Sequence, residues 1–175
     1  MTDESIPTIR RATVSDARLL AELGARTFSE TFAADNKPED IAAYLAACFS
    51  PERQAAELAD HLSTFLIAEI NGIAVGYAML HAGVAPKGVS GENPIEFVRF
   101  YVSREWHGQG IGEALMQACI DEARQEDFRT VWLGVWEHNG RARAFYRKWK
   151  FRDVGEHIFH LGADLQNDIL MERRV

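Results

Sequence analysis

The segment from Glu96 to Gly112 constrains the fold of this chain more than any other part of the sequence. A β-type run ending at Val102 leads into a turn with glycine at positions 108, 110 and 112, and a helical apolar pattern follows. Such glycines let backbone N–H groups approach a ligand closely, and the unpaired amides and dipole of the helix favour a phosphate. The segment therefore predicts an anion site at the start of a helix.

The glycine spacing does not match two common phosphate-binding motifs. A Walker loop ends in Gly-Lys-Ser or Gly-Lys-Thr, and a dinucleotide fingerprint reads G-x-G-x-x-G in an early βαβ unit. Here the turn comes late in the chain, after a predicted antiparallel hairpin that turns at Asn71 and Gly72. The order argues against a doubly wound nucleotide-binding fold. Taken alone, the glycines are also consistent with a tight turn that binds nothing.

Periodicity and turn signals predict the remaining elements. Strands are expected over 8–12, 64–69, 73–81, 95–102, 130–136, 151–161 and 168–173. Helices are expected from an N-cap at Ser15 to Phe28, over 41–48, from Ser50 to Leu62, over 111–119 and over 139–149. The Gly- and Pro-rich stretch 82–94 predicts a loop that could lie over a site. Because the sequence shows no repeat or linker, residues 1–175 are interpreted as one α/β domain.

Charge and cysteine content limit the partners and the compartment. The 175 residues carry a net charge of -7, from 19 Lys and Arg against 26 Asp and Glu, and no basic cluster offsets it. We therefore expect no nucleic acid and no membrane partner, while a cationic small molecule would suit an acidic surface. The short acidic segment Met1 to Pro7 does not resemble a signal peptide. Cys48 and Cys119 are typical of buried thiols in a reducing compartment, which predicts a cytoplasmic protein.

Two motifs at the expected separation resemble those of the GNAT acetyltransferase superfamily. His107, Gly110 and Gly112 occupy the positions of its acyl-CoA loop, Arg/Gln-x-x-Gly-x-Gly/Ala, with His107 in place of the usual Arg or Gln. The run from Asn139 to Tyr146 matches a second signature, Asn-x-x-Ala-x-x-Phe-Tyr. The resemblance implies a mixed, twisted sheet with splayed central parallel strands and helices on both faces. It also implies an N-acetyltransferase that uses acetyl-CoA.

Three further segments resemble the PaiA-like polyamine N-acetyltransferases within this superfamily. They are 27–32, 132–137 and the tail from Phe159 to Met171. This resemblance implies acetylation of a small primary amine, such as spermidine, by direct attack in a ternary complex. A peptide or protein amine is the alternative acceptor, and a non-catalytic acyl-CoA-binding regulator is the alternative from another class. A homodimer is left open.

The resemblance also assigns the groups that hold acetyl-CoA. The pyrophosphate is expected on the backbone amides of the glycine turn, at His107, Gly108, Gln109, Gly110, Ile111 and Gly112. Strand groups of Phe100, Tyr101 and Val102 are expected to face the pantetheine, with the Val102 amide as the donor to the thioester oxygen. Asn139 is expected to cap its helix, to hold the cofactor, or both.

Proton transfers require an acid and a base. Tyr146 matches the tyrosine that protonates the departing thiolate, because a phenol with a pKa of about 10 is protonated at neutral pH; its alternative role is a core aromatic. Glu96 and Glu137, on or just beyond central strands, are the candidates to take a proton from the amine directly or through water.

Acidic residues near the acceptor mouth are the remaining candidates. Glu30 and Asp35 are expected there to bind the cationic acceptor. His157 and His160 point to opposite faces of a strand and lack a third ligand, so no metal site is predicted.

Overall fold

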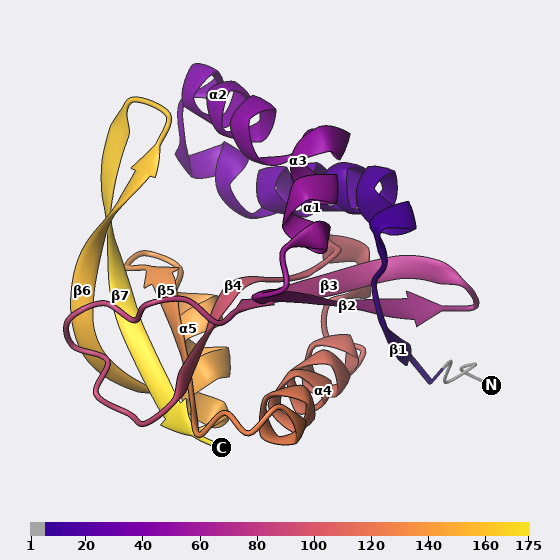
Figure 1. Ribbon diagram of the computed structural model, residues 1–175. Helices are drawn as coiled ribbons and strands as arrows, with labels where there is room; N and C mark the ends of the chain where they lie inside the picture. The colour runs from indigo at the N-terminus through magenta and orange to yellow at the C-terminus, as the bar shows by residue number, and fades with distance from the viewer. Residues whose placement is uncertain (1–5) are drawn as a thin grey trace.

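The computed structural model describes residues 6–175, within which seven strands form one sheet in the order β1-β2-β3-β4-β5-β7-β6 (Figure 1). The strands are β1 Thr8–Arg11, β2 Ser63–Ile70, β3 Ile73–His81, β4 Pro94–Val102, β5 Thr130–Trp136, β6 Arg152–Leu161 and β7 Asp164–Arg174. The helices are α1 Ala17–Phe32, α2 Pro38–Cys48, α3 Pro51–Ala59, α4 Ile111–Gln125 and α5 Gly140–Lys148. Short 3-10 turns lie at Val14–Asp16, Ala33–Asp35 and Arg104–Trp106. Residues 1–5, part of the segment expected not to be a signal peptide, lie outside the described residues.

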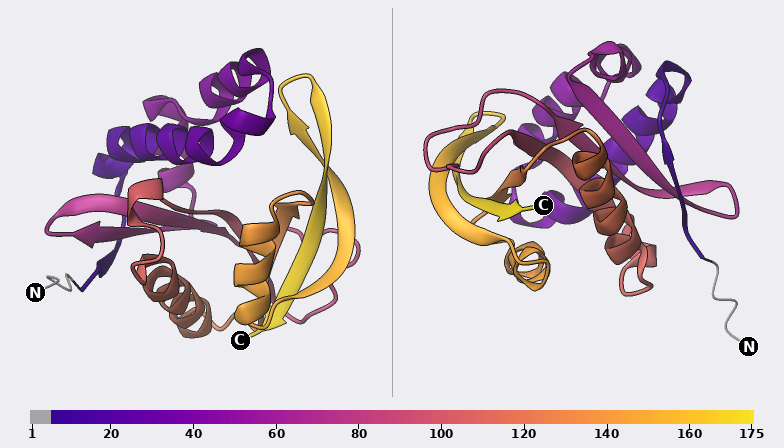
Figure 2. Two further views of the ribbon diagram at one scale, coloured as in Figure 1. Left: turned by 180° about the vertical axis from the view of Figure 1, so that it is seen from behind. Right: turned by 60° about the horizontal axis from the view of Figure 1, so that its bottom comes forward.

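Helices cover both faces of the sheet, as expected (Figures 1 and 2). Helices α4 and α5 pack against one face, where Leu115, Leu133 and Tyr146 belong to one buried apolar cluster. Helices α1, α2 and α3 lie on the opposite face, where Leu20 and Tyr77 belong to a second cluster. The long β6–β7 hairpin rises on this second side, opposite α2. Within the described residues, no helix is long and apolar enough to cross a bilayer.

Local signals confirm several predicted boundaries. Asn71 and Gly72 have positive φ angles of 51° and 77°, as a two-residue hairpin turn between β2 and β3 requires. Ser50 accepts a hydrogen bond from the Arg53 amide at 3.1 Å and Pro51 follows it, so the predicted start of α3 is confirmed.

Several predicted boundaries are wrong, and local interactions or turns explain three of them. Ser15 does not cap α1, because a 3-10 turn precedes the helix and the Thr13 amide donates to Asp16 at its entrance. Helix α3 ends at Ala59 and leaves Leu62 in a partly exposed turn. Strand β7 begins at Asp164 rather than Asp168, because a tight turn at Gly162 sends the chain straight back along β6.

The centre of the sheet is joined by a short parallel seam. Strands β4 and β5 pair only at Pro94, Ile95 and Glu96, while β4 continues along β3 as far as Val102. Strand β5 pairs along its whole length with β7. Beyond Glu96 the two central strands therefore diverge, which confirms the splayed parallel pair.

A bulge in β4 sits just beyond this seam. Met79 pairs with Arg99 and Leu80 with Phe97, so Val98 is an extra residue. Because the bulge resets the alternation of side chains, Glu96 and Tyr101 end on the same face of the sheet.

Candidate active site

A cavity of about 600 Å³ opens where β4 and β5 diverge. Its lining comes from both central strands, from α1 and α2 on one side, from β6 and β7 on another, and from the starts of α4 and α5. Much of the lining is aromatic: Phe28, Phe32, Tyr44, Phe49, Phe97, Phe100, Tyr101, Trp136, Phe145, Tyr146 and Phe159. The divergence of two strands thus creates a deep site without an inserted domain.

The glycine turn forms one end of the cavity. Gly108 and Gly110 have φ angles of 77° and 79°, a left-handed backbone conformation that is unfavourable for residues with a Cβ atom. A Cβ atom at either position would meet no atom within 4 Å, so the turn leaves open space above its backbone. Gly110 is the N-cap of α4 and provides no side chain to pair with the first amides of the helix. The turn is therefore suited to a phosphate group.

His107 fastens this turn to its surroundings. Its Nε2 atom lies 2.7 Å from the Val102 carbonyl oxygen, and its Nδ1 atom lies 2.6 Å from the Arg141 guanidinium at the start of α5. Arginine can only donate, so Nδ1 accepts and Nε2 donates. Both ring nitrogens are occupied within the protein, so this histidine holds the shape of the loop.

The main chain of β4 presents alternate residues to the gap. The Ser103 amide donates to Val75 of β3 at 2.8 Å, and the Tyr101 carbonyl faces Gly76 of β3. By alternation, the N–H and C=O groups of Phe100 and Val102 face the gap. Tyr101 differs from the expectation made for it: its main chain is directed to β3, and its side chain lines the cavity.

Tyr146 reaches the cavity from α5. Asn139 sets the start of this helix, because its side-chain oxygen accepts a hydrogen bond from the Ala142 amide at 3.2 Å. The Tyr146 ring packs edge-on against Phe100, with 6.3 Å between centroids. Burial raises the pKa of Tyr146, which keeps its hydroxyl group protonated and able to donate.

The two candidate bases occupy different environments. Glu96 lines the cavity at the end of the parallel seam, and burial raises its pKa to about 7. Glu137 follows β5, is 38% exposed and lies outside the cavity lining. Its carboxylate is 3.4 Å from the Asn167 amide nitrogen and 3.5 Å from the His138 ring. The structure thus brings Glu96, and not Glu137, to the cavity.

The two predicted acceptor-binding carboxylates also separate. Glu30 lines the cavity, but one of its oxygens accepts a hydrogen bond from the Arg104 amide at 2.9 Å and so anchors the end of α1. Asp35 is exposed in the turn after α1 and does not line the cavity. Its expected role at the acceptor mouth stays a prediction.

The 82–94 loop does not cover the cavity either. None of residues 82–93 lines it, and the Ser90 amide instead donates to Glu172 of β7 at 3.0 Å. A Cβ atom on Gly88 would lie 3.0 Å from the Val154 carbonyl of β6. The loop packs against the β6–β7 pair because its glycines permit this close approach.

Sequence reasoning missed Asp168 and its partner. Asp168 of β7 is 8% exposed and lines the cavity, with its carboxylate 3.6 Å from the His157 ring of β6. Burial raises the pKa of Asp168 to about 6. The Tyr101 side chain lines the same cavity, and burial raises its pKa as well. The long β6–β7 pairing, which the sequence pattern did not reveal, brings Asp168 here.

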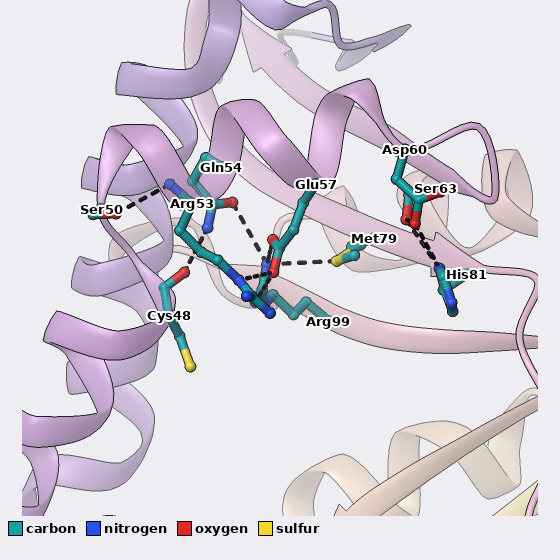
Figure 3. Close-up of polar contacts among 10 residues, drawn as sticks. All are labelled: Cys48, Ser50, Arg53, Gln54, Glu57, Asp60, Ser63, Met79, His81 and Arg99. Atoms are coloured by element: carbon teal, nitrogen blue, oxygen red, sulfur yellow. Dashed lines mark hydrogen bonds and ion pairs between the residues drawn. The ribbon is translucent and has the colours of Figure 1, made fainter.

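A buried ion pair joins β4 to α3 (Figure 3), and its arginine belongs to the cavity lining. Arg99 of β4 donates to Glu57 of α3 at 2.6 Å and lies 5.0 Å from the centre of the Phe49 ring. Gln54 accepts from Arg99 at 3.5 Å and donates to the Cys48 carbonyl at 2.6 Å. The Arg99 charge is thus neutralised by the protein, which leaves it poorly placed to bind an anionic acceptor.

A sequence model described as "Acetyltransferase (GNAT) family" matches residues 22–151. The chain belongs to the GNAT family of acetyltransferases. It is 33% identical over 147 residues to an uncharacterised N-acetyltransferase of Lactobacillus delbrueckii subsp. lactis, covering 84% of this chain and 85% of that protein. It is 36% identical over 162 residues to an uncharacterised N-acetyltransferase of Mycobacterium tuberculosis, covering 93% and 99%.

Solved GNAT structures share the fold at low sequence identity. PaiA N-acetyltransferase from Thermoplasma acidophilum, solved with coenzyme A, has a TM-score of 0.76 and 21% identity, covering 97% of this chain and 99% of that one. The ribosomal-protein-S18-alanine N-acetyltransferase of Escherichia coli has a TM-score of 0.71 and 18% identity, covering 97% and 94%.

The GNAT enzymes are N-acetyltransferases that use acetyl-CoA, and this is the activity of the chain. Its residues fit that cofactor. The open space above Gly108 and Gly110 suits a pyrophosphate, and the free N–H and C=O groups of Phe100 and the free N–H of Val102 suit the amides of a pantetheine arm.

Proposed function

We propose that this GNAT enzyme acetylates a small primary amine of the polyamine type, such as spermidine, by direct attack in a ternary complex. The observation that carries the proposal is the environment of Glu96. Within residues 6–175 no lysine or arginine forms an ion pair with this carboxylate, which lines an aromatic cavity at the point where the central strands part. A buried carboxylate beside aromatic faces is suited to a cationic amine.

In this proposal Glu96 prepares the acceptor. A primary amine with a pKa of about 10.4 is almost fully protonated at neutral pH and must lose a proton before it attacks. Glu96 takes that proton directly or through a water molecule. Its pKa of about 7 suits a general base near neutral pH.

Acetyl-CoA supplies the thioester carbon, and the protein stabilises the charges that develop around it. The N–H groups of Val102 and Phe100 face the gap and can donate to the carbonyl oxygen. The Tyr146 hydroxyl donates a proton to the departing sulfur. The glycine turn from His107 to Gly112 holds the cofactor at its phosphate end.

Two alternatives have different requirements. A peptide or protein amine would need an open groove along the cavity, whereas the lining includes α1 and α2 on one side and the β6–β7 hairpin on another. A non-catalytic acyl-CoA sensor would have no use for a proton donor, whereas Tyr146 lines the cavity. We extend the proposal to a cytoplasmic location, and it leaves a homodimer open.

A panel of acceptors distinguishes these functions. The purified protein is incubated with acetyl-CoA and with spermidine, putrescine, butylamine or an alanyl peptide, and free thiol is recorded. Turnover with the small amines, well above that with the peptide, supports the proposal. Turnover with the peptide alone, or cofactor binding without turnover of any acceptor, contradicts it.

A further inference from the structure

Asp168 is a buried carboxylate that the chemistry described above does not use. It is 8% exposed, lines the cavity and forms no ion pair with a lysine or arginine among residues 6–175. The His157 ring lies 3.6 Å from the Asp168 carboxylate. A buried charge is costly unless something pairs with it, so a carboxylate that faces a cavity without a lysine or arginine partner indicates a cationic ligand.

The surroundings of Asp168 favour an organic ammonium. Trp136 lies directly across the strand pair from Asp168, and its ring packs against Phe32, with 6.0 Å between centroids. Tyr101 is a further aromatic residue in the lining of the same cavity. Aromatic faces attract ammonium groups, and a single carboxylate among them offers too few ligands for a divalent metal ion.

Competing cations in the cavity lining are already engaged. The Arg99 guanidinium is paired with the Glu57 carboxylate, whereas those of Arg141 and Arg104 donate to the His107 ring and to the Glu30 main-chain carbonyl. The region that contains Glu96 and Asp168 therefore carries two carboxylates without an arginine or lysine partner among the described residues. Such a region favours an acceptor with two positive charges over one with a single charge.

The sheet places Asp168 at a useful distance from Glu96. Glu96 pairs with Trp132, and a Cβ atom on Gly134, two residues further along β5, would lie 3.2 Å from the Asp168 carboxylate. Two residues along a strand and one strand spacing across put the Gly134 backbone, beside which the Asp168 carboxylate lies, roughly 8 Å from the Glu96 backbone. The Glu96 and Asp168 side chains lie on the same face of the sheet. Glu96 pairs with Trp132 and Asp168 with Trp136, and residues an even number apart on one strand share a face. A short-chain alkane diamine can bridge such a gap.

We propose that Asp168 binds the second, non-reacting ammonium group of a diamine or polyamine acceptor while Glu96 receives the proton of the reacting end. This inference rests on the proposed function and deepens it, because it makes Asp168 the residue that distinguishes diamines from monoamines. His157 holds the carboxylate in place, and the small residue Gly134 leaves room for it.

The decisive comparison uses putrescine and butylamine, which share the reacting end and differ in the second ammonium group. Asp168→Asn should raise the KM for putrescine about tenfold or more, the effect of losing one charge-assisted contact. The KM and kcat for butylamine should stay within about twofold of those of the parent, a change far below one such contact. Calorimetric titration of putrescine into the CoA-loaded protein should show the same loss of affinity without turnover.

Two further variants make the test specific. Gly134→Ala keeps the Asp168 charge but crowds its carboxylate, so it should also weaken the binding of putrescine more than that of butylamine. Glu156→Gln removes an exposed carboxylate from neighbouring β6 and should change the KM for neither acceptor. An equal change for putrescine and butylamine in Asp168→Asn overturns the inference and leaves the proposed function intact. A parent enzyme that acetylates neither amine overturns both.

Discussion

Burial shifts the pKa values of the two proposed proton-transfer groups, Glu96 and Tyr146, in the same direction but with different chemical results. It raises the pKa of Glu96 to about 7, which makes a carboxylate a useful base near neutral pH. It raises the pKa of Tyr146 as well, which keeps a phenol protonated as an acid. One apolar environment thus supports both transfers.

Replacing Tyr146 with phenylalanine removes the proposed acid and little else. The ring contacts with Phe100 and Phe151 remain, so the fold and acetyl-CoA affinity should be retained. Turnover should fall by roughly 10², the usual scale for one general acid. Steady-state rates with the best amine of the panel check this, and a nearly parental rate would assign the proton to water or another group.

The pH profile tests Glu96. Above about pH 7 its carboxylate is ionised and can accept a proton, so kcat/KM should rise as pH increases through this value. In Glu96→Gln this rise should disappear, while the slower increase from the amine's own ionisation remains. Identical profiles in the parent and the variant would exclude Glu96 as the base, and Glu137→Gln provides the matched comparison.

Among individual residues, the sequence could predict the positions of those that belong to a short local motif. Tyr146 and the glycine turn are tied to short local patterns, so they could be found without the structure. Asp168 could not, because its side chain enters the cavity only through the pairing of β7 with β5. The nearness of Asp35 to Glu30 in sequence likewise gave no indication of the exposed turn after α1 in which Asp35 lies.

At the scale of elements, the turn between β4 and α4 combines two left-handed glycines with a helix start. Gly110→Asp would place a negative charge and a side chain where the phosphate is expected, in a backbone conformation that aspartate adopts with difficulty. Acetyl-CoA affinity should fall by at least tenfold, as expected for the loss of a favourable charge interaction and the gain of a repulsive one. Calorimetry measures it, with Gly72→Asp in the distant hairpin turn as the control for backbone strain.

Element types and order were largely predictable, whereas the way the strands meet was not. Periodicity found the hairpin of β2 and β3, and Pro51 marked the start of α3 correctly. The extra residue Val98, which turns Glu96 and Tyr101 to one face, leaves no pattern in the sequence. Bulges depend on pairing with a neighbouring strand, so only the folded sheet reveals them.

Stability is a property of the whole molecule, and Glu96 should lower it above neutral pH. Its pKa is raised in the folded state, so the fold binds this proton more tightly than the unfolded chain does. The resulting destabilisation grows as pH rises from about 4.5 to about 7 and is complete above that range. Glu96→Gln should therefore raise Tm at pH 8, by about 2–4 °C for each kcal/mol relieved, and leave it unchanged at pH 4. Calorimetric scans at both pH values check this.

Because β4 and β5 part after Glu96, the cavity contains strand backbone that lacks a neighbour, and recognition there does not depend on side-chain identity. Val102→Ala should therefore bind acetyl-CoA nearly as well as the parent. Val102→Pro removes an amide that β3 does not use and should bind far more weakly, although the sheet is retained. Equal acetyl-CoA affinities in the two variants would show that the Val102 amide does not contribute to binding. A contact made by the main chain survives most point mutations, so this part of the site can tolerate sequence drift that would destroy a site built from side chains.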